Sequence, residues 1–91
     1  MKVMNKTKEY IAIKVNTHSI KFFVGVGKYL KEEDYTFDKS NGYYRENPLS
    51  IKGVNVYEMD NDYILVDLKT KNSKIISKEE FEQDYVELKD W

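Results

Sequence analysis

Residues 60–88 read DNDYILVDLKTKNSKIISKEEFEQDYVEL, and this stretch decides the fold. A polar turn at residues 60–62 leads into residues 63–68, which are rich in strand-forming side chains. A second polar turn at residues 69–73 and a short return strand at residues 74–76 follow. The stretch therefore predicts two antiparallel strands that are closed by a helix.

The closing helix is expected to begin after Ser77. Ser77 and Glu80 have the spacing of a capping box, in which the hydroxyl accepts a hydrogen bond from a first-turn N–H and the glutamate reaches back to the cap residue. Phe81, Tyr85 and Leu88 follow at spacings of four and three, which places them on one helix face. We expect a helix of about three turns that depends on packing against the preceding strands.

The size and composition of the chain exclude several classes of protein. The chain has 91 residues, so we expect residues 1–91 to form a single domain. It contains no cysteine, which excludes a disulfide framework, a thiolate metal site and a cysteine nucleophile. No apolar run approaches the roughly 20 residues that a membrane-spanning helix needs, and no signal peptide is evident. We therefore expect a cytoplasmic protein that does not bind membranes.

Charge is distributed unevenly along the chain. Residues 1–31 carry seven lysines and one acidic residue, a net charge of +6, whereas residues 32–91 carry eight basic and fifteen acidic residues, a net charge of −7. This asymmetry is either chance surface charge or two faces of opposite sign, which would suit head-to-tail self-association or a charged partner. The candidate basic face consists of Lys14, Lys21, Lys28 and Lys31.

The first half of the chain predicts a strand followed by a helix. Residues 1–6 are expected to be a frayed start, and residues 9–15 alternate as a half-buried strand does. Asn16 or Thr17 is the expected cap of the helix that follows. The residues expected on the buried side of this helix are Ile20, Phe23, Val24, Gly27, Tyr29 and Leu30.

Gly25 and Gly27 need an explanation, because each costs up to about 1 kcal/mol relative to alanine inside a helix. One interpretation is that they allow the helix to approach the sheet closely. The other is that residues 22–26 form a strand, since phenylalanine and valine favour strands. The sequence GVGK at residues 25–28 lacks the spacing of a phosphate-binding loop, so nucleotide hydrolysis is not predicted.

The middle of the chain completes the predicted fold. Residues 35–37 indicate a short strand, and residues 49–59 indicate another that is interrupted by Gly53. We expect residues 49–59 to pair with residues 63–68 as a hairpin. The predicted class is α+β: a small antiparallel sheet of four to five strands with two helices on one face, in the order β-α-β-β-β-β-α.

Three segments, NDYIL, IISKEEF and DY, resemble the C-terminal half of a group of small tailed-phage and prophage proteins of unknown function. In that group a strand that begins GDYIV precedes a turn, a short strand that ends in Pro or Ser with Lys, and a helix that carries F-E and then Y. The corresponding residues here are Asn61, Asp62, Tyr63, Ile64, Ser77, Lys78, Phe81, Glu82 and Tyr85. Asn61 stands where the group usually has glycine, and the turn at residues 69–73 also lacks its glycine. The resemblance implies a viral or mobile-element context and a compact α+β fold, without catalytic residues.

Catalytic and metal-binding patterns are not evident. His18 is the sole histidine, and we expect it to be a solvated turn residue because no partner stands at ligand spacing. Asp60 and Asp62 suggest a calcium loop, but its required glycine and terminal glutamate are missing. No nucleophile elbow or dinucleotide fingerprint occurs. We therefore predict no catalytic residue, no metal and no cofactor, and a protein that is not an enzyme.

The tyrosines are the unusual feature, with eight in the chain. Tyr43 and Tyr44 directly precede Arg45 in a predicted loop, and tyrosine and arginine are enriched at binding hot spots. The alternative is that one of these tyrosines packs into the core. Trp91 at the end of the chain would add a contact if it is exposed. These four residues are the predicted partner-binding set.

Four functional hypotheses remain at this level. The favoured one is a small phage-type accessory protein that acts by non-enzymatic binding and inhibits a bacterial host protein, such as a component of an antiviral defence system. The first alternative is a nucleic-acid module that uses the lysine-rich N-terminal third. Another is a protein that sequesters a signalling nucleotide, with Tyr43 or Tyr44 on the base and Arg45 or Lys28 on the phosphate. The last is a structural virion component that forms homo-oligomers.

Overall fold

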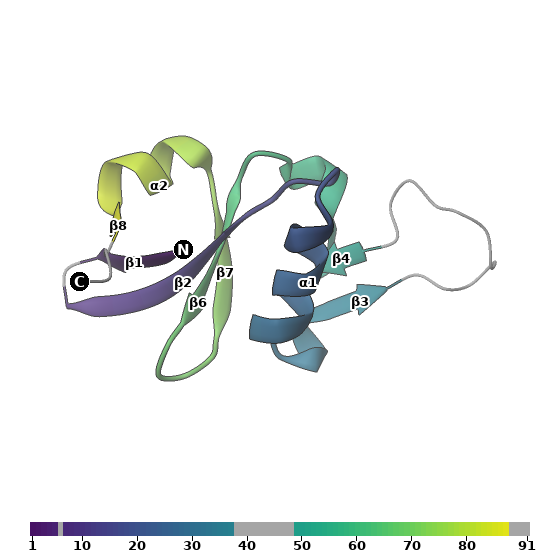
Figure 1. Cartoon of the computed structure of the whole chain (residues 1–91), viewed down its shortest axis with the longest axis horizontal. Helices are drawn as coiled ribbons and strands as arrows, with labels where there is room; N and C mark the ends of the chain where they lie inside the picture. The colour runs from purple at the N-terminus through teal and green to yellow at the C-terminus, as the bar shows by residue number, and fades with distance from the viewer. Residues whose placement is uncertain (6, 38–48, 88–91) are drawn as a thin grey trace.

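A computed structural model describes residues 1–5, 7–37 and 49–87 of the chain, and Figure 1 shows how its elements are arranged. The larger sheet has the spatial order β7 (Ser73–Ile76), β6 (Tyr63–Asp67), β2 (Lys8–Lys14), β1 (Lys2–Asn5) and β8 (Val86–Glu87). The smaller sheet consists of β3 (Tyr35–Phe37), β4 (Leu49–Ile51) and β5 (Val54–Asn55). The helices are α1 (Ile20–Tyr29) and α2 (Lys78–Asp84), and short 3₁₀ turns occur at η1 (Glu32–Asp34) and η2 (Val56–Met59). The predicted α+β class with mostly antiparallel strands is confirmed.

Strands β2 and β6 form the centre of the larger sheet. They pair antiparallel, with Ala12 opposite Leu65 and Ile13 opposite Ile64. Residues 63–66 of β6 are all buried, so this strand is covered on both faces. A continuous apolar run is the pattern expected of such a strand, because neither side of it meets water.

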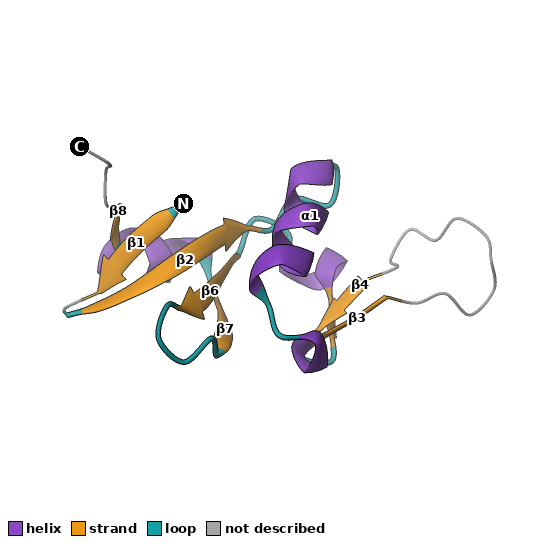
Figure 2. Ribbon diagram, turned by 60° about the horizontal axis from the view of Figure 1, so that its bottom comes forward, coloured by secondary structure: helices purple, strands orange, loops and turns teal. Residues whose placement is uncertain are grey.

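Helix α1 covers one face of the β2–β6 pair. Its buried residues Phe22 and Val26 belong to the same core cluster as Ile13, Ile64 and Val66 of the sheet. The same cluster continues into the smaller sheet and η2 through Leu49, Ile51, Val56 and Met59. Helix α1 therefore packs against residues of both sheets, and Figure 2 shows it beside β3 and β4.

Helix α2 covers the opposite face of the same strands. Phe81 packs with Tyr63, whose ring is stacked on it with a centroid distance of 3.8 Å, and the cluster also includes Ala12 and Leu65. Since side chains alternate along a strand, Leu65 and Ile64 point to different faces. The expectation that both helices lie on one face is therefore wrong, because a strand that is apolar at every position needs cover on both sides.

Two expectations about α1 are wrong, namely its N-cap residue and the side of the helix that is buried. Ser19 is the N-cap residue in place of Asn16 or Thr17, and the Asn16 side chain instead accepts a hydrogen bond from the His18 backbone N–H at 3.0 Å. Residues 22–26 are helical, which resolves the choice between helix and strand. The buried positions are Phe22, Val26 and Leu30, so Ile20 and Val24 lie on the exposed side.

The start of α2 agrees with the sequence, whereas its end does not. The Ser77 hydroxyl accepts a hydrogen bond from the Glu80 backbone N–H at 3.1 Å, which confirms the predicted cap. The helix stops at Asp84 after about two turns. The chain then forms β8, which pairs with β1 through Met4 and Val86. Residues 2–5 are therefore a strand instead of a frayed start, and β8 ends the helix early.

The predicted hairpin between residues 49–59 and 63–68 is wrong. Strand β6 pairs with β2 and β7, while β4 pairs with β3 and β5 in the separate sheet. The turn before β6 is nevertheless present, with Asn61 at a φ of 74°. Its backbone N–H donates to the Val15 carbonyl at 3.1 Å, so this turn aligns β6 with β2. Gly53, at a φ of 83°, forms the tight β4–β5 turn.

The two helix glycines are not needed for close approach to the sheet. A Cβ atom at Gly25 would lie 3.8 Å from the Ile13 Cγ2 atom, which is an ordinary van der Waals contact. At Gly27 no atom lies within 4 Å of such a Cβ. The close-approach interpretation is therefore wrong for Gly27, and alanine would also fit at Gly25.

We predict that Gly27→Ala stabilises the protein by about 0.5–1 kcal/mol, because alanine removes the entropic cost of glycine inside a helix and meets no obstacle. Urea unfolding followed by circular dichroism measures the change. As a matched control, Gly53→Ala should destabilise by about 1 kcal/mol, because a Cβ is unfavourable at the positive φ of that turn. Destabilisation by Gly27→Ala would show that α1 differs from the helix described above.

Candidate functional site

The outer face of α1 is the surface with the most distinctive chemistry. It consists of the exposed residues Ile20, Lys21, Val24, Gly27 and Lys28. The side chains of Ile20 and Val24 are 80% and 62% exposed, although both are large and aliphatic. They stand four residues apart and are therefore adjacent on the helix surface. Packing of Phe22 and Val26 into the core is what turns this side of the helix outward.

The electrostatic character of this outer face is basic. Residues 20–31 contain three lysines and no acidic residue. The Lys28 ammonium lies 5.1 Å from the centroid of the Tyr29 ring, which is within range of a cation–π interaction. The Ile20–Val24 pair is thus flanked by positive charge on its own helix.

The four lysines of the predicted basic face do not form one uniform surface. Lys21 and Lys28 belong to the outer face of α1, and Lys14 is exposed at the end of β2. Lys31 is instead engaged with the β6–β7 loop, because its ammonium donates to the Asn72 side-chain oxygen at 2.8 Å. Lys21 and Lys28 therefore lie on one side of α1 and Lys31 has a structural contact, while a binding role for the four lysines stays a prediction.

The predicted partner-binding residues Tyr43, Tyr44, Arg45 and Trp91 lie outside the described residues. Their role stays a prediction. His18 is exposed in the turn before α1, as expected. Within residues 1–5, 7–37 and 49–87, no group of three or more metal-ligating side chains could hold a metal ion, and no helix is long and apolar enough to cross a membrane.

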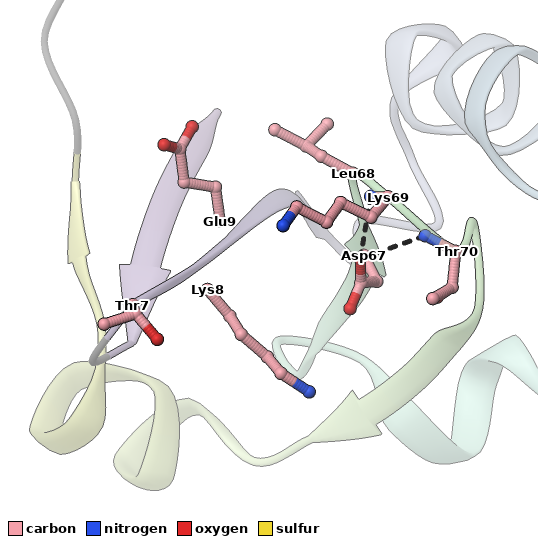
Figure 3. Close-up of a pocket in the computed structure, with 7 residues that line it drawn as sticks. All are labelled: Thr7, Lys8, Glu9, Asp67, Leu68, Lys69 and Thr70. Atoms are coloured by element: carbon pink, nitrogen blue, oxygen red, sulfur yellow. Dashed lines mark hydrogen bonds between the residues drawn. The ribbon is translucent and has the colours of Figure 1, made fainter.

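A pocket of about 430 Å³ lies between the start of β2 and the β6–β7 loop (Figure 3). Lys8 and Glu9 contribute to it from β2 and extend to opposite sides of that strand. Asp67, Lys69 and Thr70 contribute from the loop. The pocket thus combines two cations with two carboxylates.

Both carboxylates of this pocket already have structural partners. The Asp67 carboxylate accepts hydrogen bonds from the Lys69 and Thr70 backbone N–H groups at 2.8 and 3.1 Å. The bonds from Thr70 and Lys69 lower the pKa of Asp67, with a smaller contribution from the nearby lysine ammonium groups. Glu9 forms an ion pair with Lys2 at 3.1 Å. A carboxylate with a lowered pKa is a poor general acid at neutral pH, so Asp67 is suited to holding the loop through its hydrogen bonds and not to donating a proton.

An aromatic cluster under α2 is a feature that sequence reasoning missed. Tyr10 and Tyr85 meet edge to face at 5.6 Å, and the Lys74 ammonium lies 5.4 and 5.8 Å from their ring centroids. A side-chain hydrogen bond with Tyr85 raises the pKa of Lys74, and burial raises the pKa of Tyr63 with a further contribution from Glu82. The spacing of the aromatic residues of α2 was visible in the sequence. Lys74, however, belongs to strand β7, so its contact with these rings could not be read from local spacing. These contacts hold α2 on the sheet.

Comparison with known proteins gave no match to a family model, to a curated protein or to a solved structure. Of the surfaces described above, the outer face of α1 combines exposed apolar area with a single sign of charge, which the pocket at Asp67 does not.

We predict that Asp67→Ala lowers the melting temperature at pH 7, because two backbone N–H groups lose their acceptor. The folded-state pKa of Asp67 lies below its unfolded value. Its stabilising contribution is therefore fully present above the unfolded pKa and is lost as the pH falls through the folded pKa. The difference between wild type and variant should narrow on acidification from pH 7 to pH 2, as circular dichroism melts would measure.

The exposed Glu58 offers a matched control for this measurement. The difference in melting temperature between wild type and Glu58→Ala should not narrow comparably on acidification, since this variant removes a carboxylate outside the loop. If the difference in melting temperature between wild type and Asp67→Ala stays constant across the pH range, the charged Asp67 carboxylate does not stabilise the loop as described.

Proposed function

We propose that this protein acts by non-enzymatic binding to another protein, through the outer face of α1. The observation that carries this proposal is the exposure of Ile20 and Val24, at 80% and 62%, on a helix whose opposite side is packed into the core. Exposed aliphatic neighbours gain free energy when a partner removes them from water, at about 25 cal/mol per Å² of apolar surface. A single exposed residue would be ordinary, whereas an adjacent pair on a rigid helix offers a contact centre.

The charges around this contact centre define the complementary partner. Lys21 and Lys28 flank the aliphatic pair, and α1 contributes no acidic side chain. Complementary potentials steer association and suppress unsuitable partners. The partner surface therefore has an apolar depression with an acidic rim.

The finer proposal is that the partner is a bacterial host protein, such as an antiviral defence component, and that binding inhibits it. Its support is the resemblance of residues 61–85 to small phage and prophage proteins, together with the compact fold. Tyr43, Tyr44, Arg45 and Trp91 are proposed as additional contacts on the basis of their residue types. These residues enter the proposal from the sequence alone.

We predict that Ile20→Ser with Val24→Ser abolishes capture of the partner while the fold is retained, because both side chains are exposed. The tagged protein would be used to capture proteins from a low-GC Gram-positive lysate, with quantitative mass spectrometry of wild type and variant. Val86→Ser is the matched control, since Val86 is 68% exposed but lies in β8, away from α1.

The expected result is a stoichiometric protein that is retained by wild type and by Val86→Ser and lost from the double variant. Lys28→Glu should weaken the same capture, most strongly at low salt, because it reverses the charge beside the aliphatic pair. Equal capture by wild type and the double variant would overturn the proposed role of α1.

A further inference from the structure

A second surface of α1 borders a groove that the proposed function does not use. This β2–α1 groove has a volume of about 390 Å³ and is lined by Ile11–Lys14 of β2 and by Lys21, Phe22, Gly25 and Tyr29 of α1. Its volume lies in the range of about 300–1,000 Å³ that is typical of small-molecule sites. Unlike the outer face, it is concave and includes backbone and side chains of the sheet.

Beside the groove, β1 pairs with β2 from Lys2, opposite Ile11, to Asn5, opposite Lys8. The last contact of this ladder joins the Ala12 backbone N–H to the Met1 carbonyl at 2.6 Å. Beyond Ala12, no described strand pairs with this edge of β2, and α1 lies above it. Gly25 leaves the middle of the groove open, because an added Cβ would already be in contact with Ile13 at 3.8 Å. The lack of a side chain at Gly25 therefore keeps the groove open, although packing of the helix on the sheet does not require glycine at this position.

The polarity of the groove changes along its length. Lys14 at the end of β2 and Lys21 in the first turn of α1 both line the groove, and a short connection joins the two elements. Asn16 and Ser19 line the same polar end. Tyr29 lies about 12 Å further along the helix, given its rise of about 1.5 Å per residue.

The charge in the groove has one sign. Its charged lining groups are the ammonium groups of Lys14, Lys21 and the Met1 N-terminus, the last of which donates a hydrogen bond to the Ala12 carbonyl at 3.2 Å. No acidic side chain lines the groove among the described residues, and none of these ammonium groups forms an ion pair with another residue in the described part of the chain. A ligand of matching character has a negative group at the lysine end and an apolar body towards Ile11 and Tyr29.

We propose that the β2–α1 groove binds a small organic anion with an apolar tail, of the class of medium-chain carboxylates. The carboxylate lies between Lys14 and Lys21, and the tail lies over Ile11 and Gly25 towards Tyr29. The extended length of such a tail matches the roughly 12 Å between the lysine end and Tyr29. The site shares Lys21 with the outer face of α1, and its other α1 residues border β2, so variants at Lys14 and Gly25 test it separately from the proposed function.

The test is a titration of ¹⁵N-labelled protein with sodium decanoate below its micellisation concentration, followed by NMR. The expected result is saturable shifts confined to the amides of Ala12, Lys14, Lys21, Gly25 and Tyr29. Acetate, which has no tail, and decyltrimethylammonium, which carries the opposite charge, should each bind at least about tenfold more weakly. Equal binding of the cationic amphiphile, or shifts spread over the whole protein, would overturn the proposal.

Two variants separate the groove from nonspecific adsorption. Lys14→Glu should weaken decanoate binding by about tenfold or more, whereas Lys78→Glu makes the same charge change in an exposed side chain of α2, on the opposite face of the sheet, and should leave it unchanged. Gly25→Leu should block the groove while it leaves the lysines in place. Retained decanoate affinity in both Lys14→Glu and Gly25→Leu would overturn the proposal, and the capture experiment on α1 would be unaffected by either outcome.

Discussion

The pairing of β2 with β6 is the constraint on which the rest of the structure depends. Its register places Ile13 and Ile64 on the face that receives α1, and Ala12 and Leu65 on the face that receives α2. A slip of one residue would exchange these faces, because side chains alternate along a strand. Both helices therefore depend on the same ladder, which the turn at Asn61 aligns through its hydrogen bond to Val15.

The segment that follows the C-terminal end of α1 is joined to the larger sheet by two hydrogen bonds. After the helix, the Lys31 ammonium binds Asn72, and the buried Ser73 hydroxyl donates to the Asp34 carboxylate at 3.1 Å. These contacts join η1 to the edge of the larger sheet across about forty residues of sequence, since Ser73 and Asp34 are 39 positions apart. The surfaces of α1 are consequently presented from a scaffold that is linked to both sheets.

Helix α1 has three sides with different roles. One side, with Phe22 and Val26, supplies core packing, and this packing compensates for two glycines that weaken the isolated helix. The outer face carries the aliphatic pair and the lysines on which the proposed protein binding rests. The third side borders the groove beside β2. One ten-residue helix therefore presents two surfaces with different chemistry.

Local chemistry in the sequence was sufficient for several features. Residues that are close together in the chain were enough to predict the Ser77 cap, the turn at residues 60–62, the strand at residues 63–67 and the α+β class. A capping hydrogen bond spans three positions and strand alternation spans two, so neither needs knowledge of the remaining fold. The three lysines in residues 20–31 were equally visible in the sequence, and two of them, Lys21 and Lys28, lie on the outer face of α1.

The candidate site was only partly predictable, because α1 carries two apolar stripes. Ile20 and Val24 form one stripe, and Phe22, Val26 and Leu30 form the other. Periodicity alone does not say which stripe meets the sheet, and the sequence interpretation placed Ile20 and Val24 inside. Tertiary packing against Ile13 and Ile64 chose the second stripe and left the first exposed.

The sequence thus indicated both helices, the strands at residues 9–15 and 63–67 and the Ser77 cap, whereas the tertiary structure determined how the strands pair and where α2 ends. Strand β6 pairs with β2 across about fifty residues, and the early end of α2 depends on β8 reaching β1, as in the Val3–Glu87 pair. The groove likewise depends on the placement of α1 beside β2. These outcomes depend on contacts between residues far apart in the chain, whose free energies are set by which apolar surfaces fit together in three dimensions.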